Sequence, residues 1–267
     1  MFRSFDVAVS GLRQHQTYID VTGNNIANVN SDGFKASRAM FEDKLSQLAR
    51  GTGMTPMPQP KGARNAAMVG LGADLRGIEG EFHQGAFKIT NTLTDFAIAG
   101  EGYFVLQGAN GPVYTRNGTF TFDANGTLRA GDGKAVLGVG GQPLTVPQGA
   151  DRPRSMTMNA AGQLVGMGAN GAQRVIGQVQ LARFTNEAGL ERVGDTEFAA
   201  TNASGAAILG TSGQNGLGDL ISGVTEHSGV DLGAELTHLI MAQRGFSANA
   251  KVMTTTDELV DRINQMR

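Results

Sequence analysis

The chain has 267 residues, a formal net charge of −2, 39 glycines and only 17% charged residues. No basic excess is available to neutralise phosphates, which argues against nucleic-acid binding. The chain contains no cysteine, which excludes disulfides, thiolate catalysis and cysteine-ligated zinc. We expect no cleaved secretory signal, because the first residues lack an apolar run, and no membrane helix, because no stretch reaches about 18 apolar residues.

Residues 3–28 are predicted to form an amphipathic helix. Apolar residues recur at steps of three and four, which places them on one face of a helix. Asn24, Asn25 and Asn28 favour caps and turns over helix interior, so the helix should end near Val29. The apolar seam predicted on this helix comprises Phe2, Phe5, Val9, Leu12, Ile19 and Ile26.

After this helix the chain changes character. Residues 34–48 are consistent with an extended stretch that leads into a short helix. In the Pro/Gly-rich segment 46–68, Pro56, Pro58 and Pro60 prevent both a helix and a central strand, so an extended arm is expected. One interpretation of the arm is a plain surface loop. The other is a segment that becomes ordered against a neighbouring subunit.

Residues 69–218 are predicted to form a mainly antiparallel β domain. Asn117-Gly118 is a strong hairpin signal between two short apolar strands. Residues 120–128 and 156–164 share one pattern, in which an apolar-Thr-apolar strand is followed by an Asx-led turn with glycine and then by leucine. This repetition indicates two similar hairpins rather than a solenoid, which requires three or more repeats.

Helical periodicity returns in residues 219–267. Asp231 is the predicted N-cap, and Glu235 lies in the first turn of the helix. The predicted apolar seam of this helix comprises Leu232, Leu236, Leu239, Phe246, Met253 and Val260.

An apolar stripe is more often the core-facing side of an ordinary helix than an assembly seam. Here both stripes are terminal, and the chain between them belongs to a different structural class, which favours packing between subunits. We therefore predict an α+β fold. In this fold, long N- and C-terminal helices pack together like a coiled coil, and the chain between them forms a central, mainly antiparallel β domain. Residues 1–45 cover the first helix and its connector.

The sequence gives little support for a catalytic, cofactor or metal site. Residues 166–171 match G-x-G-x-x-G, but a predicted strand follows them where a dinucleotide site needs a helix. Glu235 and His238 resemble half of a di-iron helix motif, which requires a second copy that is absent from the sequence. We expect no enzyme activity, no cofactor and no small-molecule substrate.

Three segments, in the expected order, resemble the bacterial flagellar rod and hook protein family. Residues 10–12 and 20–35 are similar to its N-terminal signature, residues 93–120 to its central β motif, and residues 228–259 to its C-terminal helix. The motif residues that carry the N-terminal resemblance include Asn24, Asn25, Asn28, Gly33 and Phe34.

The resemblance implies a non-enzymatic subunit of the flagellar axial structure. Such a subunit leaves the cell through the flagellar export apparatus and polymerises with copies of itself in the basal body, outside the cytoplasmic membrane. Other rod and hook proteins would be its neighbours, and the basal-body rings would surround it. Chain length and the extra stretch at 46–68 favour the distal rod, which transmits torque from the motor to the hook.

Two alternatives remain open at this point. A short hook protein is the alternative within the family. From another class, a glycine-rich β adhesin or fibre protein with helical oligomerisation ends would form a closed trimer rather than an open helical polymer.

Overall fold

The computed structural model describes residues 2–44, 47–50, 67–147, 153, 155–159, 161–168 and 172–266. The chain divides into two compact units. The first combines Met1–Ile26, Ser37–Glu79 and Leu232–Arg267, and the second combines Ala27–Ala36 and Gly80–Asp231. The long segment of the second unit, Gly80–Asp231, starts and ends later in the sequence than the predicted β range 69–218, and the unit also includes the ten residues Ala27–Ala36.

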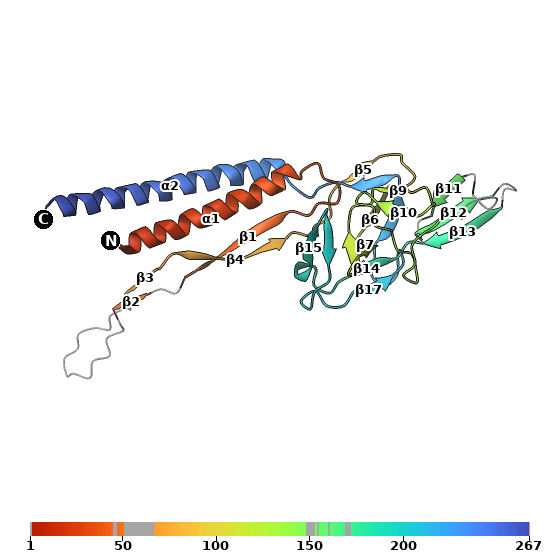
Figure 1. Ribbon diagram of the computed structural model, residues 1–267, viewed down its shortest axis with the longest axis horizontal. Helices are drawn as coiled ribbons and strands as arrows, with labels where there is room; N and C mark the ends of the chain where they lie inside the picture. Colours follow the sequence, from red (N-terminus) through yellow and green to blue (C-terminus); the bar gives the residue numbers. More distant parts are fainter. Residues whose placement is uncertain are drawn as a thin grey trace, which may run out of the picture. The chain divides into compact units, whose positions relative to one another are not determined.

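The first unit contains both long helices, α1 (Phe2–Ala27) and α2 (Leu232–Gln265), which lie side by side (Figure 1). Helix α1 ends two residues before the predicted position, within the asparagine cluster. Helix α2 begins directly after Asp231, with Glu235 in its first turn. The predicted range 219–267 also includes two strands ahead of the helix, β18 (Asp219–Ser222) and β19 (Val224–Glu226).

A β ribbon completes the first unit. Strand β1 (Ser37–Asp43) pairs with β4 (Ala73–Gly80), and β2 (Gln47–Arg50) pairs antiparallel with β3 (Ala67–Val69). The short helix expected within residues 34–48 was a wrong prediction. Pairing with a distant strand satisfies the backbone of this segment, and such pairing overrides a weak local helical pattern.

The second unit is built around a six-stranded sheet with the order β15-β16-β8-β7-β14-β17, in which all pairs are antiparallel. Its strands are β7 (Tyr103–Gly108), β8 (Gly111–Thr115), β14 (Leu181–Arg183), β15 (Glu191–Gly194), β16 (Glu197–Ala199) and β17 (Ile208–Gly210). A 3₁₀ turn, η2 (Glu187–Gly189), lies between β14 and β15.

The second unit also contains smaller antiparallel sheets. Strand β5 (Phe87–Ile89) pairs with β19, and β6 (Phe96–Ala99) pairs with β18. Two further sheets are formed by β9 (Phe120–Phe122) with β10 (Leu128–Ala130), and by β11 (Ser155–Met158), β12 (Gln163–Met167) and β13 (Gln173–Gln178). Together with the two helices, this architecture confirms the predicted α+β class.

Strand β7 divides the core of the second unit into two clusters. Phe104 and Leu106 point into one apolar cluster, and Tyr103 and Val105 point into the other. This split follows the two-residue period of a strand, and all four side chains are buried. Because both faces of β7 are covered, the strand reads as a continuous apolar run rather than as an alternating one.

The two hairpins predicted from the repeated pattern are confirmed. In one, Phe122 faces Leu128, and in the other, Met158 faces Leu164. The side chains of Asp123 and Asn159 each accept a hydrogen bond from the backbone N–H four residues later, at 2.8 and 2.9 Å. The fourth turn residue is in both cases a glycine with positive φ, which that position favours.

Asn117-Gly118 does not join a hairpin, contrary to the prediction. Strand β8 before it pairs with β7 and β16, whereas β9 after it pairs with β10. The Asn117 side chain accepts hydrogen bonds from the backbone and hydroxyl of Thr119, and the backbone N–H of Phe96 donates to the Gly118 carbonyl. The dipeptide therefore turns the chain from one sheet into another, and any Cβ at position 118 would collide with the Phe96 carbonyl.

Candidate subunit-interface surfaces

The two helices of the first unit run antiparallel. Asn25 donates a 2.9 Å hydrogen bond to the Glu235 carboxylate, and the Tyr18 and His238 rings lie 6.0 Å apart. Farther along, a Cβ on Gly245 would meet the His15 ring, and one on Gly11 would meet the Asn249 side chain. Residue numbers along the contact therefore fall on α1 while they rise on α2, as in an antiparallel pair.

The contact line between the helices is made largely of small and polar residues. Its buried members include Ala8 and Thr22 on α1, and Ala242 and Thr256 on α2. Small residues allow two helix backbones to approach closely, as the glycine contacts require. The predicted apolar seams are therefore not the centre of this contact.

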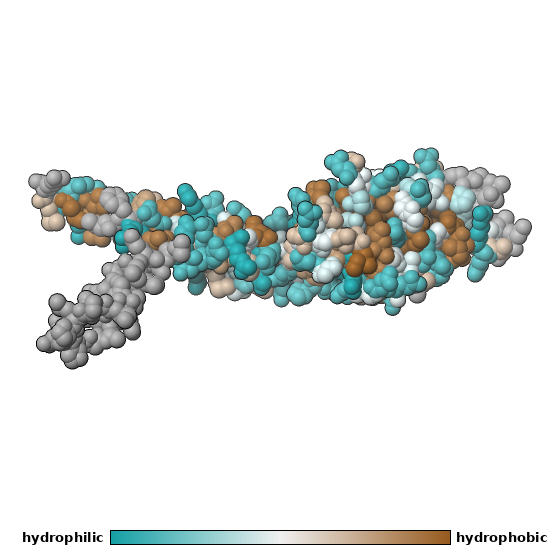
Figure 2. Space-filling view, turned by 90° about the horizontal axis from the view of Figure 1, so that it is seen from below, coloured by the Kyte–Doolittle hydropathy of each residue, from teal (hydrophilic) through white to brown (hydrophobic). Residues whose placement is uncertain are grey.

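The predicted seam residues flank the contact line instead. On α1, those with described side chains are half-buried: Phe5, Val9, Leu12, Ile19 and Ile26. On α2, Leu239, Met253 and Val260 are half-buried, whereas Leu232, Leu236 and Phe246 are exposed. Figure 2 shows apolar side chains reaching the surface along the helices. The side chain of Phe2 and the three arm prolines, Pro56, Pro58 and Pro60, lie outside the described residues.

Helical geometry places most of the two predicted seams on one side of the helix pair. Successive residues turn by 100° around a helix, so Phe5, Val9 and Leu12 are displaced in the same rotational sense from Ala8 as Leu236 and Leu239 are from Ala242. In an antiparallel pair, equal senses of displacement fall on the same side. Most of the two predicted seams therefore lie on one side of the helix pair, beside the contact line of small and polar residues.

The motif asparagines have separate roles at the end of α1. The buried Asn25 accepts a hydrogen bond from the Ser37 N–H and donates one to the Ser37 carbonyl, both within the first unit. Asn28 accepts a 3.1 Å hydrogen bond from the Ser31 hydroxyl. Asn24 is exposed. The motif thus fixes how the chain leaves the helix.

Gly33 and Phe34 belong to the second unit. Gly33 has φ +73°, its N–H donates to the Glu226 carbonyl at 2.7 Å, and a Cβ there would collide with the backbone of Asn117. Phe34 is buried, with the Arg192 guanidinium 5.3 Å from its ring centre. Glycine at 33 is therefore required both by backbone conformation and by space.

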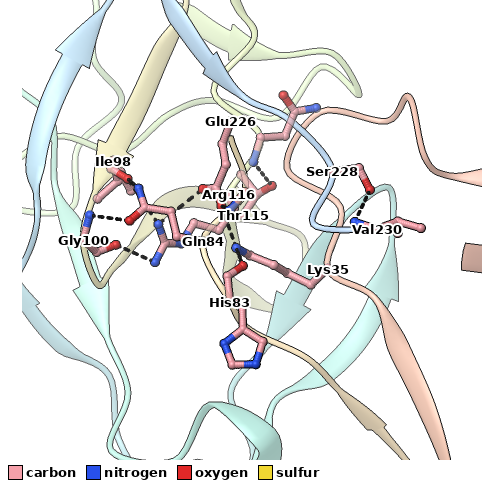
Figure 3. Close-up of polar contacts among 12 residues, drawn as sticks. Lys35, His83, Gln84, Ile98, Gly100, Thr115, Arg116, Glu226, Ser228 and Val230 are labelled. Carbon is pink, nitrogen blue, oxygen red and sulfur yellow. Dashed lines mark hydrogen bonds and ion pairs between the residues drawn. The ribbon is translucent and has the colours of Figure 1, made fainter. Parts of the chain in front are cut away.

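A buried charge cluster lies beside this turn, and sequence reasoning missed it (Figure 3). Lys35 Nζ is 2.6 Å from Glu226 Oε1, and both side chains are 1% exposed. Arg116 Nη1 is 3.4 Å from Glu226 Oε2, and its Nη2 donates to the Gly100 carbonyl at 2.8 Å. Lys35 Nζ also donates to the His83 carbonyl, and the Gly85 N–H donates to Glu226 Oε1. One carboxylate therefore neutralises two cations taken from distant parts of the chain.

Burial shifts the pKa values of titratable groups in and beside the cluster. Burial lowers the pKa of the Lys35 ammonium, and the neighbouring Glu226 carboxylate only partly opposes this. Burial also raises the pKa of Tyr103, whose ring lies 5.2 Å from the Arg116 guanidinium. The Tyr103 hydroxyl lies within electrostatic reach of Glu187, but no group satisfies it at hydrogen-bonding geometry among the described residues. These contacts organise structure and offer no paired acid and base in a cleft.

The described part of the chain shows where the residues of the other motifs considered in the sequence analysis lie. No group of three or more His, Asp or Glu side chains there is placed to hold a metal ion. His238 Nδ1 lies 3.9 Å from a Glu235 carboxylate oxygen, and its ring is tilted against the ring of Tyr18. The glycine pattern at 166–171 begins in β12 and is followed by strand β13, with residues 169–171 outside the described range. No helix among the described residues is both long and apolar enough to cross a membrane.

Comparisons with known proteins match the sequence along the whole chain. Residues 5–35 match a family model described as flagella basal body rod protein, residues 97–166 match the flagellar hook protein FlgE/F/G D1 domain, and residues 221–266 match the flagellar basal body rod FlgEFG protein C-terminal model. The first and last matches cover most of α1 and all of α2.

Individual relatives agree with the family models. The flagellar basal-body rod protein FlgG of Bacillus subtilis is 37% identical over all of both chains, and that of Caulobacter vibrioides is 36% identical over 97% of each. The flagellar hook protein FlgE of Borreliella burgdorferi is 26% identical, in an alignment that spans 443 positions. The chain belongs to the family of flagellar basal-body rod and hook proteins.

Proposed function

We propose that this chain is a structural subunit of the flagellar basal body that polymerises into the distal rod and carries torque from the motor to the hook. Relatives named as basal-body rod proteins match at higher identity and over equal lengths, which supports the rod over the hook. Neighbouring rod and hook proteins would continue the structure at either end. The flagellar export apparatus would deliver the subunits, and the basal-body rings would surround the finished rod.

The observation that carries the proposal is the exposed apolar surface of the helix pair. Leu236 and Phe246 are 45% and 38% exposed although both belong to the predicted seam, because α1 contacts α2 through a different line of residues. Burying a large apolar side chain contributes about 1.5–3 kcal/mol. Several such side chains per subunit provide a driving force for assembly that the single chain does not use.

In the polymer, helices from neighbouring copies would cover this face in a coiled-coil manner and form an inner tube. The contact line within each chain uses small residues and hydrogen bonds, so the helix pair can form before assembly. The second unit would lie outside the tube and add contacts between subunits. The arm at 46–68 would bridge neighbouring copies and hold the tube straight.

Assembly of the purified full chain tests this function. We expect open helical polymers by negative-stain microscopy at high concentration, whereas a closed trimer by sizing chromatography would favour the fibre-protein alternative. The variant Leu236→Ser/Phe246→Ser should assemble poorly. The variant monomer should still fold and lose only part of the burial energy of these two side chains, because 45% of Leu236 and 38% of Phe246 are exposed in the single chain. Thr237→Ala, on the same exposed stretch of α2, is the matched control and should assemble normally.

Wild-type chain that stays monomeric at all concentrations would contradict the proposal. So would normal polymers from the double variant, because they would show that the exposed seam is not an assembly surface.

A further inference from the structure

Helix α1 and the ribbon beside it border an open hollow of about 340 Å³ within the first unit. The helix contributes the side chains of one face, and the ribbon contributes strand β4 and the residue after β1. Its polar lining residues include Asp6, Ser10, Arg13, Gln14, Lys44 and Asp74. Val9 and the exposed Leu75 supply apolar walls. The hollow thus offers both apolar surface and charged groups.

Several polar groups in the hollow have no ion-pair or hydrogen-bond partner within the described part of the chain. Lys44 and Asp74 approach each other to 3.5 Å, but Asp6 and Arg13 have no ion-pair partner there. The Gln14 side-chain nitrogen is buried without a hydrogen-bond partner among the same residues. A buried donor without a partner costs about 1–3 kcal/mol, so an incoming acceptor would be favoured at this place.

The end of α2 extends past α1 and exposes apolar side chains. In the three contacts Asn25–Glu235, His15–Gly245 and Gly11–Asn249, the two residue numbers add up to 260 each time. The same register places Phe2 beside about residue 258, so the last turns of α2 lie past the described part of α1. Leu259, Ile263 and Met266 are exposed there, the last at 81%.

We propose that the last two turns of α2 in one copy dock into the hollow between α1 and the ribbon of the next copy. This inference rests on the proposed function and names the surfaces that meet. The exposed stripe of Leu259 and Ile263 would cover Val9 and Leu75. Arg262, which lies in the last turn of α2, would pair with Asp6.

The helix end itself matches the unused donors. The last carbonyls of a helix lack intrahelical partners and carry partial negative charge. Gln14 and Arg13 are donors that can satisfy them. Because the hollow and the helix end are different surfaces of one chain, the contact is head-to-tail. A contact of this kind gives an open polymer rather than a closed dimer.

Disulfide crosslinking tests the contact directly, because the natural chain contains no cysteine. Ser10→Cys lines the hollow, and Ile263→Cys lies on the helix end. By the helix register these positions are about 20 Å apart in one chain, well beyond the about 7 Å that a disulfide spans between Cα atoms. Only two different copies can therefore form the bond.

We expect mixed polymers of the two single-cysteine chains to yield a covalent dimer on mild oxidation. Mixed polymers of Thr121→Cys and Ile263→Cys chains, in which residue 121 lies on β9 of the second unit, should yield none. Polymers in which Ser10→Cys and Ile263→Cys give no more dimer than this control pair would overturn the proposal.

A charge swap tests the predicted pair. Asp6→Arg and Arg262→Asp should each raise the concentration needed for assembly by about tenfold, as loss of a charge-assisted contact predicts. The double variant should recover most of this loss. Arg262→Asp places an acid in the last turn of α2, where it opposes the helix dipole, so recovery in the double variant cannot come from a more stable α2. Asp20→Arg, an exposed acidic residue of α1 outside the hollow, is the control and should not be rescued by Arg262→Asp.

The outcomes separate this inference from the function on which it rests. Wild-type chain that never polymerises removes the proposed function. Wild-type chain that polymerises without the crosslink removes only the docking of α2 into the hollow, and a crosslink without rescue by the charge swap removes the Asp6–Arg262 pair from it. A crosslink together with rescue supports both.

Discussion

At the residue scale, Glu226 holds the charge cluster of the second unit together. Its carboxylate contacts Lys35 and Arg116, and all three side chains are almost fully buried. Glu226→Gln would leave two buried cations without an anion, which typically costs about 3–5 kcal/mol of unfolding free energy. We expect a loss of this size in urea unfolding of the full chain, followed by the near-ultraviolet dichroism of the tyrosines. Glu191→Gln, an exposed residue of β15, should change stability by less than about 0.5 kcal/mol.

A double-mutant cycle separates pairing from packing in this cluster. Lys35→Met introduced into the Glu226→Gln background removes one of the stranded cations. The double variant should therefore be more stable than the sum of the single changes predicts, by about 0.5–3 kcal/mol. Strictly additive losses would show that the 2.6 Å contact contributes no coupling.

The Asp123 turn predicts a pH dependence. A hydrogen bond from Arg129, followed by backbone N–H groups of Thr127 and Asn125, holds the pKa of Asp123 below its usual value. A carboxyl whose pKa is lower in the folded state stabilises the fold above the unfolded-state pKa, and this contribution disappears as pH falls through the folded-state value. Asp123→Asn should therefore lose stability near neutral pH and converge with the wild type in acid.

Thermal melts across the acidic range measure this convergence. The turn itself should survive in Asp123→Asn, because Asn159 accepts the equivalent backbone hydrogen bond in the second hairpin. Asp195→Asn, in an exposed turn at φ +48°, is the control for a surface Asp-to-Asn change and should alter stability near neutral pH by less than about 0.5 kcal/mol. A constant difference between Asp123→Asn and the wild type at all pH values would contradict the assignment.

At the element scale, the two glycines of α1 allow the contribution of the contact with α2 to be measured separately from the contribution of helix propensity. A side chain on Gly11 would meet Asn249, whereas nothing lies within 4 Å of a Cβ on Gly23. Gly23→Ala should stabilise the helix by up to about 1 kcal/mol. Gly11→Leu should destabilise the pair, although leucine is the better helix former. Far-ultraviolet dichroism during urea unfolding measures both, and equal stabilisation by the two variants would contradict the helix contact.

The same elements show which features of the fold could be predicted from the sequence and which could not. Local signals sufficed for both helices and for the two Asx-Gly hairpins, because caps, periodicity and turn chemistry act within a few residues. The inner face of each helix was not predictable from apolar periodicity, since the contact uses Gly11, Ala242 and Gly245 rather than the largest side chains. The Lys35–Glu226 pair joins residues 191 positions apart, and only the sheet topology brings them together.

At the scale of the whole molecule, the arm offers a test of what keeps the polymer straight. Residues 51–66 lie outside the described structure, but β2 and β3 on either side of them are paired, with Arg50 opposite Ala67. Replacing residues 51–66 by Asn-Gly would therefore close this hairpin with a turn that its geometry favours. If the arm bridges neighbouring subunits, its loss should leave polymers that form but curve like a hook.

A second variant separates the presence of the arm from its stiffness. Pro56→Ser/Pro58→Ser/Pro60→Ser keeps the length of the arm but removes the residues that restrict its backbone. Since a flexible tether still spans two subunits but resists bending less, this variant should give curvature between that of the wild type and that of the shortened chain. Curvature is measured from electron micrographs of polymers assembled under one condition. Straight polymers from the shortened chain would mean that the helix pair alone makes the tube rigid.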